Sequence, residues 1–254
     1  MRYQPDAPAA VLSPHLDDAV LSAWSVLRRP GEVRVINVCT AVPPPGPAPP
    51  WDRLTGARDA AERMRERLDE DREALAKAGR ESVALGFLDA HYRDAPIDRD
   101  ELTAALSAAV GAVSELWAPA GIGAHVDHVQ VRDAALDLAG GGPPIRLYAE
   151  LPYAVRYGWP SWVTGEARPD PVDYDAWWTA ALPGGAPLPA AAHRLPAEEM
   201  DRKLDALRTY RTQWTALDMA DIGLISRPVT LRHEVSFAAR AAGLSSPAAA
   251  PARR

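Results

Sequence analysis

Cysteine is almost absent from this sequence: Cys39 is the only one in 254 residues. A single cysteine excludes an intrachain disulfide and a cysteine-rich metal site, so any bound metal must be held by His, Asp or Glu. Long apolar runs are also missing, and none approaches the length of a membrane span. The N-terminal segment is charged early and contains prolines, which is not typical of a signal peptide. We therefore expect a cytoplasmic protein.

Positive charge is in short supply as well. The formal net charge is -6, and the basic residues are scattered rather than clustered, so DNA or RNA partners are not expected. The hydrophobic content of 47% is ordinary for a globular protein with a core. We expect a single domain over residues 1–254 that acts on a small molecule, and a homo-oligomer is compatible with this composition.

Short β-branched runs alternate with longer amphipathic stretches, which is the pattern of βαβ units that build a parallel sheet covered on both faces. The expected strands are Ala9–Ser13, Val33–Val38, Ser82–Gly86, Glu115–Ala118 and Ile145–Glu150. The expected helices are Asp18–Arg28, Arg53–Ala78, Arg99–Val113, His128–Ala139 and Ala197–Gln213. The predicted fold class is α/β, a Rossmann-like, mostly parallel sheet flanked by helices, with a loop-rich C-terminal elaboration.

Three irregular stretches lie between these elements, and loops held by a rigid sheet often carry function. They are Val42–Trp51, Pro119–Asp127 and residues 152–195. The last is too long for a simple connection, so we expect a lid or substrate-loop insertion there. Residues 243–254 are expected to form a disordered tail. Five of the eight tryptophans fall in these loops, namely Trp51, Trp159, Trp162, Trp177 and Trp178. At a pocket rim they would stack on sugar faces or enclose an acyl chain; the alternative is that they cover the sheet edge as a small separate core.

The first chemical motif follows the first expected strand and has the sequence Ser-Pro-His-Leu-Asp-Asp, ending at Asp18. It stands at the carboxyl end of a strand, where open α/β sheets bind ligands. His15 and Asp18 are three residues apart, so on a strand-to-helix turn they can converge on one ion while Asp17 points elsewhere. A separate carboxylate suits hydrolysis, because a metal-activated water must lose a proton to a base. The bland alternative is an Asp pair that caps a helix.

The second motif, Gly-Ile-Gly-Ala-His-Val-Asp-His over residues 121–128, follows the fourth expected strand. His125 and His128 are again three residues apart and lie beside an acid, Asp127. Both motifs are expected at the same edge of the sheet, and two histidines with one carboxylate leave a coordination position open for water. That combination is typical of a catalytic rather than a structural zinc site.

At these residues the chain resembles the PIG-L or LmbE-like family of zinc-dependent N-acetylglucosaminyl deacetylases. The resemblance covers roughly residues 8–215 in the family's order. Its segments are Leu12–Leu21, Arg67–Leu75, Leu88–Ala90, Ala118–Arg132, Tyr148–Ala154 and Lys203–Gln213.

The resemblance implies that His15, Asp18 and His128 bind one zinc ion per chain, that Asp17 is the general base, and that His125 is the partner acid. In this scheme His125 acts as an imidazolium that steadies the oxyanion or protonates the leaving amine. Iron(II) is compatible with the same ligands. Asp127 is placed in sequence either to orient an imidazole or to cap the following helix.

One position departs from the family pattern. Members that act on glucosaminyl-inositol carry a tyrosine where this chain has Gly123, which argues against a substrate of the mycothiol pathway. A hydroxyl from Tyr153 or Tyr92 on another loop is a candidate replacement.

Further candidates for substrate contact are Arg67, Asp89, Glu150 and Tyr153. Their structural alternatives are a solvated salt-bridge face for Arg67, loop capping for Asp89 and Glu150, and a partly buried aromatic for Tyr153.

The predicted function is removal of an N-acetyl or other N-acyl group from an amino sugar, within a secondary metabolite or glycolipid precursor. An amidase of thiol conjugates or acylated antibiotic intermediates would use the same chemistry. A nucleotide-binding Rossmann module is disfavoured, because the turn at residues 13–18 has no glycine and its two acids would repel a pyrophosphate. A binding protein without catalysis is disfavoured by Asp17, a base for which such a protein has no use.

Overall fold

The computed structural model describes residues 6–185, 188–217 and 228–239, and its strands form one mixed sheet in the order β3-β2-β1-β4-β5-β7-β6. Strands β1 to β5 run parallel, and β7 and β6 complete one edge in antiparallel pairing. The strands are β1 (Ala9–Ser13), β2 (Val33–Asn37), β3 (Ser82–Ala84), β4 (Glu115–Pro119), β5 (Ile145–Tyr148), β6 (Ala190–Arg194) and β7 (His233–Ala239). The α/β prediction, with a mostly parallel sheet, is confirmed.

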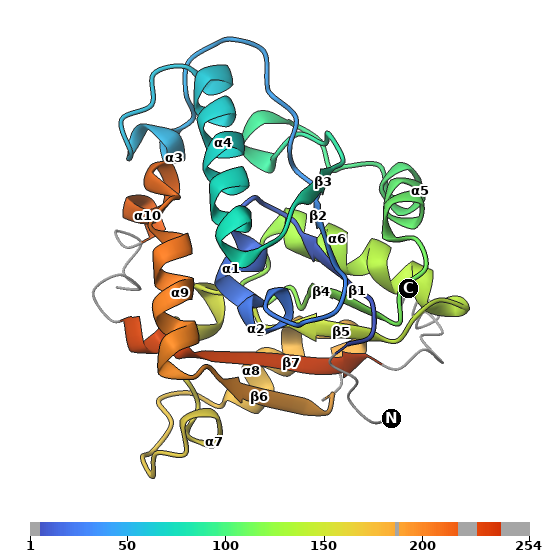
Figure 1. Cartoon of the computed structure of the whole chain (residues 1–254), viewed down its shortest axis with the longest axis vertical. Helices are drawn as coiled ribbons and strands as arrows, with labels where there is room; N and C mark the ends of the chain where they lie inside the picture. The colour runs from blue at the N-terminus through green and yellow to red at the C-terminus, as the bar shows by residue number, and fades with distance from the viewer. Residues whose placement is uncertain (1–5, 186–187, 218–227, 240–254) are drawn as a thin grey trace, which may run out of the picture.

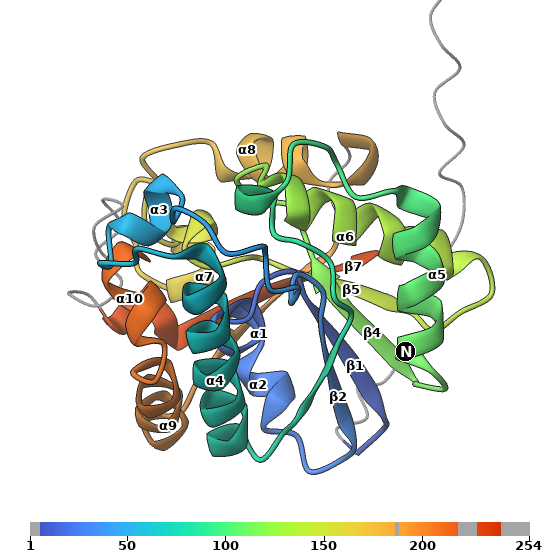
Figure 2. The same cartoon turned by 90° about the horizontal axis from the view of Figure 1, so that it is seen from above.

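Helices cover both faces of this sheet (Figures 1 and 2). Those on one face include α1 (Asp18–Ser22), α2 (Trp24–Leu27), α4 (Ala60–Ala78) and α9 (Ala197–Leu207), and those on the other include α5 (Arg99–Val110) and α6 (Val126–Asp137). Shorter helices are α3 (Pro50–Arg53), α7 (Ser161–Thr164), α8 (Tyr174–Ala181) and α10 (Arg211–Leu217), with single 3₁₀ turns such as η1 (Ala90–Tyr92) and η3 (Tyr153–Val155). Strand β1 is completely buried between the layers, as expected of a central parallel strand.

The strand order explains why the two motifs meet. Strand β1 pairs with β2 on one side and directly with β4 on the other, so successive connections leave β1 in opposite directions. Such a switch point opens a crevice at the carboxyl ends of the two strands. The turn after β1 carries the first motif, and the loop after β4 carries the second.

Three predicted helices are each broken in two, for reasons that lie in tertiary contacts or in a glycine. Asp18–Arg28 divides at Ala23, because the Glu234 carboxylate accepts hydrogen bonds from the backbone N–H groups of Trp24 (2.9 Å) and Ser25 (3.0 Å) and so starts a second helix. Ala197–Gln213 divides because Glu70 binds the backbone N–H of Thr212 at 3.1 Å in the same way.

The third broken helix, predicted over Arg53–Ala78, is interrupted by Gly56, which has a φ of +83°. Its longer part, α4, begins after Asp59, whose side chain accepts from the Glu62 N–H, and ends at the left-handed Gly79.

Several predicted ends differ by one to three residues. Strands β2, β3 and β5 end earlier than expected and β4 one residue later, while α5 stops at Val110 and the fourth expected helix starts two residues earlier, at Val126. These differences move no motif residue away from the sheet edge.

The stretch 152–195 is not irregular, which corrects the sequence prediction. It contains η3, α7, α8 and the strand β6, which pairs with β7. Trp177 and Trp178 lie on α8 rather than in a loop. The Trp178 ring makes edge-to-face contacts with the rings of Trp159, Trp162, Tyr174 and Phe237. Trp159 and Trp178 belong to the main hydrophobic core and Trp177 packs against it, so the separate small core expected from the sequence is not formed. Of the five tryptophans only Trp51 lines the pocket described below. The expected tail at 243–254 lies outside the described residues.

Among the described residues, no helix is long and apolar enough to cross a membrane.

Candidate active site

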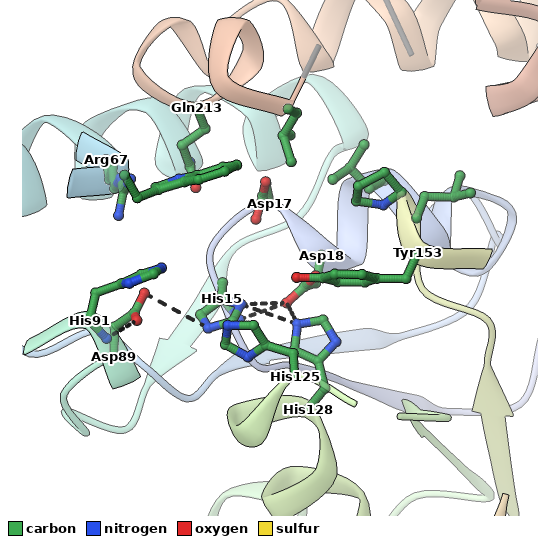
Figure 3. A pocket seen from close by; sticks show the side chains of 15 residues that line it. His15, Asp17, Asp18, Arg67, Asp89, His91, His125, His128, Tyr153 and Gln213 are labelled. Carbon is green, nitrogen blue, oxygen red and sulfur yellow. Dashed lines mark hydrogen bonds and ion pairs between the residues drawn. The ribbon is translucent and has the colours of Figure 1, made fainter. Parts of the chain in front are cut away.

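Three candidate ligand atoms from the two motifs lie close together at the carboxyl edge of the sheet (Figure 3). His128 Nε2 is 3.2 Å from His15 Nδ1 and 3.2 Å from Asp18 Oδ2, and His15 Nδ1 is 3.4 Å from Asp18 Oδ2. Ligand atoms about 2.0–2.1 Å from a tetrahedral zinc ion are separated by about 3.4 Å. The side chains therefore fit a small divalent cation with little rearrangement.

Two other groups lie near these atoms. The ring nitrogens of His15, His125 and His128 lie within 4.8 Å of one another, and so do ligand atoms of His15, Cys39 and Asp127. Burial raises the pKa of the Cys39 thiol, which favours the neutral form and makes it a poor metal ligand. In the triad of His15, Asp18 and His128 all three separations are 3.2–3.4 Å.

Each of the two histidines is held from behind by a carboxylate. His15 Nε2 donates to Asp127 Oδ2 at 3.0 Å, and His128 Nδ1 donates to Glu150 Oε1 at 3.3 Å. Both carboxylates are fully buried. Donation from one ring nitrogen leaves the lone pair of the other nitrogen facing the cation position, as in many metal sites in proteins.

The sequence predicts that Glu150 contacts the substrate, but in the structure this side chain lies outside the pocket. Glu150 does not line the pocket, and its oxygens also accept from the backbone N–H groups of Gly121 (2.5 Å) and Ile122 (3.2 Å). It ties the end of β5 to the glycine loop of the second motif. Asp127 likewise does more than cap a helix, because it accepts from the Ala90 N–H at 3.0 Å and pairs with Arg93.

The first motif is shaped by Ser13, at the end of β1. Its hydroxyl donates to the His15 carbonyl at 2.6 Å and accepts from the Ala19 N–H at 3.0 Å. The Asp18 carboxylate closes the same turn by accepting from the His15 N–H at 2.8 Å. This tight turn directs His15 and Asp18 to one side, as their spacing predicts.

Asp17 stands apart from these contacts. Its carboxylate makes no hydrogen bond or ion pair with another side chain in the described part of the protein, and Figure 3 shows it directed into the pocket on the side of Arg67 and Gln213. Burial and the neighbouring Asp18 charge raise the pKa of Asp17 to about 6. Burial opposes ionisation of Asp18 too, but the His128 and His15 rings outweigh it and hold the pKa of Asp18 well below its usual value. The two adjacent acids therefore differ strongly in basicity.

The surroundings of His125 influence its protonation state. Burial and the nearby His15 and His128 lower the pKa of His125 to about 4, so it is neutral at neutral pH in the metal-free protein. Its Nδ1 accepts from the Asp127 N–H at 3.3 Å, which leaves the proton on Nε2. In the metal-free protein the neutral imidazole is therefore favoured, and the role of His125 as the partner acid stays a prediction.

Three of the predicted substrate contacts do line the pocket: Arg67, Asp89 and Tyr153. Arg67 is buried, with Nη2 2.5 Å from Asp52 Oδ1, so the solvated salt-bridge alternative is wrong. Asp89 Oδ2 lies 3.8 Å from His15 Nε2, and Asp89 also caps η1. The catalytic and substrate roles of these residues stay predictions.

Tyr153 occupies the space next to Gly123. A Cβ added at Gly123 would lie 2.5 Å from Tyr153 Cδ1, and Gly123 has a φ of +91°, which disfavours other residues. Figure 3 shows the phenol ring of Tyr153 extending toward Asp18. Burial and the Asp18 charge raise the pKa of Tyr153, so its hydroxyl stays protonated. Tyr92 is engaged elsewhere, since its hydroxyl donates to Asp52 at 2.6 Å.

Sequence reasoning missed three residues near the site, namely Arg93, His91 and Gln213, whereas Trp51, which it offered as a sugar-stacking aromatic, does lie at the pocket. Arg93 pairs with Asp127 and donates to the Leu88 carbonyl at 2.8 Å. His91 and Gln213 line the pocket. Gln213 ends a segment that resembles the family, and this was the available signal for it.

Known deacetylases resemble this chain in sequence and in fold. No protein-family model matches the chain. A curated relative, the 2'-N-acetylparomamine deacetylase of Streptomyces fradiae, is 33% identical over 162 residues, which cover 57% of this chain and 57% of the relative. The match thus spans little more than half of that enzyme.

Two solved structures match over more of the chain. The A40926 pseudoaglycone deacetylase Dbv21 has a TM-score of 0.68 and 26% identity, covering 94% of this chain and 100% of its own. A triple mutant of a deacetylase of the teicoplanin biosynthetic pathway has a TM-score of 0.68 and 27% identity, covering 91% and 97%. These relatives are deacetylases. Their names connect them with antibiotics or with antibiotic biosynthesis. The resemblance of this chain to the PIG-L or LmbE-like family stays a prediction.

Proposed function

We propose that this protein is a metal-dependent deacetylase that hydrolyses the N-acyl group of an amino sugar within an antibiotic or related secondary metabolite. The observation that carries the proposal is the triad of His15, Asp18 and His128 atoms, 3.2–3.4 Å apart, with the carboxylate of Asp17 left over beside it. The relatives act on an acetylated aminoglycoside and on glycopeptide antibiotics or their precursors. They favour, among the predicted alternatives, amides in antibiotic intermediates over thiol conjugates.

Zinc is the proposed metal, one ion per chain. Two imidazoles and one carboxylate form a ligand set that zinc binds in hydrolases, and iron(II) is compatible with it. A zinc ion bound there polarises an amide carbonyl and makes water more acidic. His15 and His128 would hold it, each oriented by the carboxylate behind it.

Asp17 is the proposed base. Its carboxylate faces the pocket, and a pKa of about 6 leaves it mostly ionised at neutral pH yet basic enough to accept a proton from water. As the water oxygen bonds to the acyl carbon and the C–N bond breaks, the same carboxyl group returns the proton to the leaving nitrogen. The products are a free carboxylic acid and an amine.

His125 and Tyr153 are the proposed donors to the oxyanion. A neutral His125 carries its proton on Nε2, and the Tyr153 hydroxyl has no hydrogen-bond partner in the described part of the chain. The two rings have centroids 6.4 Å apart on the same side of the pocket. Donors fixed before the reaction stabilise developing negative charge without reorganisation. Tyr153 would thus take the place of the tyrosine that the family pattern has at Gly123.

The test combines metal content with amine release. We expect the purified protein to bind about one zinc per chain and to release amine from N-acetylglucosaminides or N-acetylated aminoglycosides. Asp17→Asn should keep the metal and lose about 100-fold to 10,000-fold in kcat. Asp137→Asn, which removes an exposed carboxylate paired with Arg99, is the matched control and should change neither. A protein that binds no zinc after reconstitution would refute the proposal.

A further inference from the structure

The turn after β1 is held mostly by its own side chains, but one of its carbonyls is bound from elsewhere. The Ser13 hydroxyl donates to the His15 carbonyl at 2.6 Å, and the His15 N–H donates to Asp18 at 2.8 Å. The next carbonyl, that of Leu16, has one donor among the described residues. This donor is the hydroxyl of Tyr210, at 3.1 Å and 194 positions away in the sequence. Tyr210 therefore fixes this part of the turn from outside the motif.

The Leu16 carbonyl belongs to the peptide group that leads into Asp17. No other side chain binds the Asp17 carboxylate in the described part of the protein, so its position depends on the backbone of the turn. Leu16 and Tyr210 are both buried, and bulk water therefore has little access to replace the hydroxyl if it is removed. The position of the Asp17 carboxylate thus depends on a hydrogen bond from Tyr210, which lies between α9 and α10.

A buried carboxyl group, Asp71 on α4, determines where the Tyr210 hydrogen points. The hydroxyl has one hydrogen but two acceptors within reach, the Leu16 carbonyl at 3.1 Å and Asp71 Oδ1 at 2.9 Å. Asp71 Oδ2 accepts from Asn37 at 2.6 Å and from Ser82 at 3.5 Å. An ionised Asp71 attracts the phenol hydrogen and leaves the Leu16 carbonyl unpaired. A proton on Oδ1 instead donates to the phenol oxygen and frees the phenol hydrogen for the carbonyl.

The surroundings of Asp71 favour its protonated form. Within the described residues no Lys, Arg or His pairs with it, and the side chains that face it from β2 and β3 are neutral. The acids that face the pair are Asp17 and Asp18, on the turn. Burial raises the pKa of Asp71 to about 7, and the Asp17 charge acts in the same direction. Burial and the Asp71 charge raise the pKa of Tyr210, so its hydroxyl keeps its hydrogen.

We propose that Tyr210 and Asp71 are positioning residues of the deacetylase. The protonated carboxyl of Asp71 directs the phenol hydrogen onto the Leu16 carbonyl. This hydrogen bond fixes the backbone that places the Asp17 carboxylate beside the metal ligands. The inference rests on the proposed function, in which Asp17 is the base. It adds to it two buried residues that act on kcat although neither lines the pocket.

The first test compares variants of the zinc-loaded protein on methyl N-acetylglucosaminide at about pH 6. Tyr210→Phe removes only the hydroxyl and should lower kcat by about 10-fold to 100-fold, with little change in KM or zinc content, because a displaced base slows the reaction without weakening binding. Asp71→Asn resembles the protonated carboxyl and should keep kcat. Tyr174→Phe is the matched control, because Tyr174 is also buried and its hydroxyl donates to a backbone carbonyl, that of Gly158, away from the pocket. It should lose stability and keep kcat.

The pH dependence gives a readout that a merely structural role would not change. The ratio of kcat for Asp71→Asn to kcat for wild type divides out the ionisation of other groups. It should be about one at about pH 6 and reach about tenfold by about pH 8.5, because the wild type loses the Asp71 proton as the pH rises through about 7. If Tyr210→Phe does not fold, this ratio decides alone. A ratio that does not change with pH would overturn the proposal.

Hydrogen exchange of the peptide covering residues 13–22 follows the turn without turnover. Tyr210→Phe should exchange faster there, and Tyr174→Phe should exchange like wild type. Unchanged exchange, or a folded Tyr210→Phe protein with kcat within about twofold of wild type, would overturn the positioning role. A wild type that hydrolyses no amide, while Tyr210→Phe still exchanges faster, would overturn the deacetylase function and leave the contact of Tyr210 with the turn standing.

Discussion

Replacing Glu150 by Gln tests whether a carboxylate behind His128 matters for metal binding. Glu150 accepts three hydrogen bonds at once, from the His128 ring and from the backbone N–H groups of Gly121 and Ile122. A glutamine of the same shape has one oxygen and one NH₂ group, so at least one of these donors would face another donor. The substitution removes the negative charge and leaves one buried N–H unpaired.

The magnitude follows from these losses. Removing a partner of a metal-binding histidine weakens metal affinity by about 10-fold to 100-fold, which is about 1.4–2.7 kcal/mol. The unpaired N–H should lower the free energy of unfolding of the metal-free protein by about 1–3 kcal/mol. Zinc affinity would be measured by competition with a chelating dye, and stability by urea unfolding.

Glu115→Gln is the matched control. Glu115 is a partly buried carboxylate at the amino end of β4, where Arg29, Trp117 and Arg146 donate to it. Its replacement should cost stability without changing zinc affinity. If Glu150→Gln is folded and binds zinc within about twofold of wild type, the reasoning that Glu150 orients His128 is wrong.

Three further predictions address the surroundings of the site. Tyr153→Phe should lower kcat by about 100-fold while KM changes little, because a donor to an oxyanion acts in the transition state; an unchanged kcat would remove Tyr153 from the mechanism. Gly123→Ala should lower the free energy of unfolding by about 1–3 kcal/mol, because its Cβ would meet the Tyr153 ring, whereas Gly140→Ala, where a Cβ meets nothing within 4 Å, should not. Burial raises the pKa of Asp71 from 3.8 to about 7 although Tyr210, Asn37 and Ser82 donate hydrogen bonds to it. The neutral form is thus favoured on folding, and its contribution is present at acidic pH and lost as the pH rises through about 7. Asp71→Asn should therefore gain stability relative to wild type as the pH rises from about 5 to 8, by about 3 kcal/mol, and a difference in Tm that does not change with pH would contradict this.

The parallel part of the sheet could be predicted because its strands are buried on both faces and are therefore continuous apolar runs. Strands β6 and β7 could not, since the Ala190–Arg194 run has no β-branched residue and depends on pairing with a segment about forty positions away. The helix breaks at Ala23 and near Thr209 could not be predicted either, because they also depend on contacts between segments that are distant in sequence. The carboxylates that start α2 and α10, Glu234 and Glu70, are far from them in sequence.

The residues of the candidate site also differ in whether the sequence alone could predict their positions. The spacing of His15 and Asp18 acts within one turn, so sequence alone could bring them together; His128 joins them because β1 and β4 are neighbours, which the βαβ pattern implies. Glu150 could not be assigned in this way. As a charged residue at a strand end it suggests contact with substrate, and only the glycine loop that folds over it shows that its oxygens are already occupied. The absence of a side chain at Gly123 is understandable in the same terms, because the Tyr153 ring fills that space. The absent side chain at Gly123 and the Tyr153 ring are then two parts of one packing arrangement. Replacing both residues together should be tolerated better than replacing either one alone.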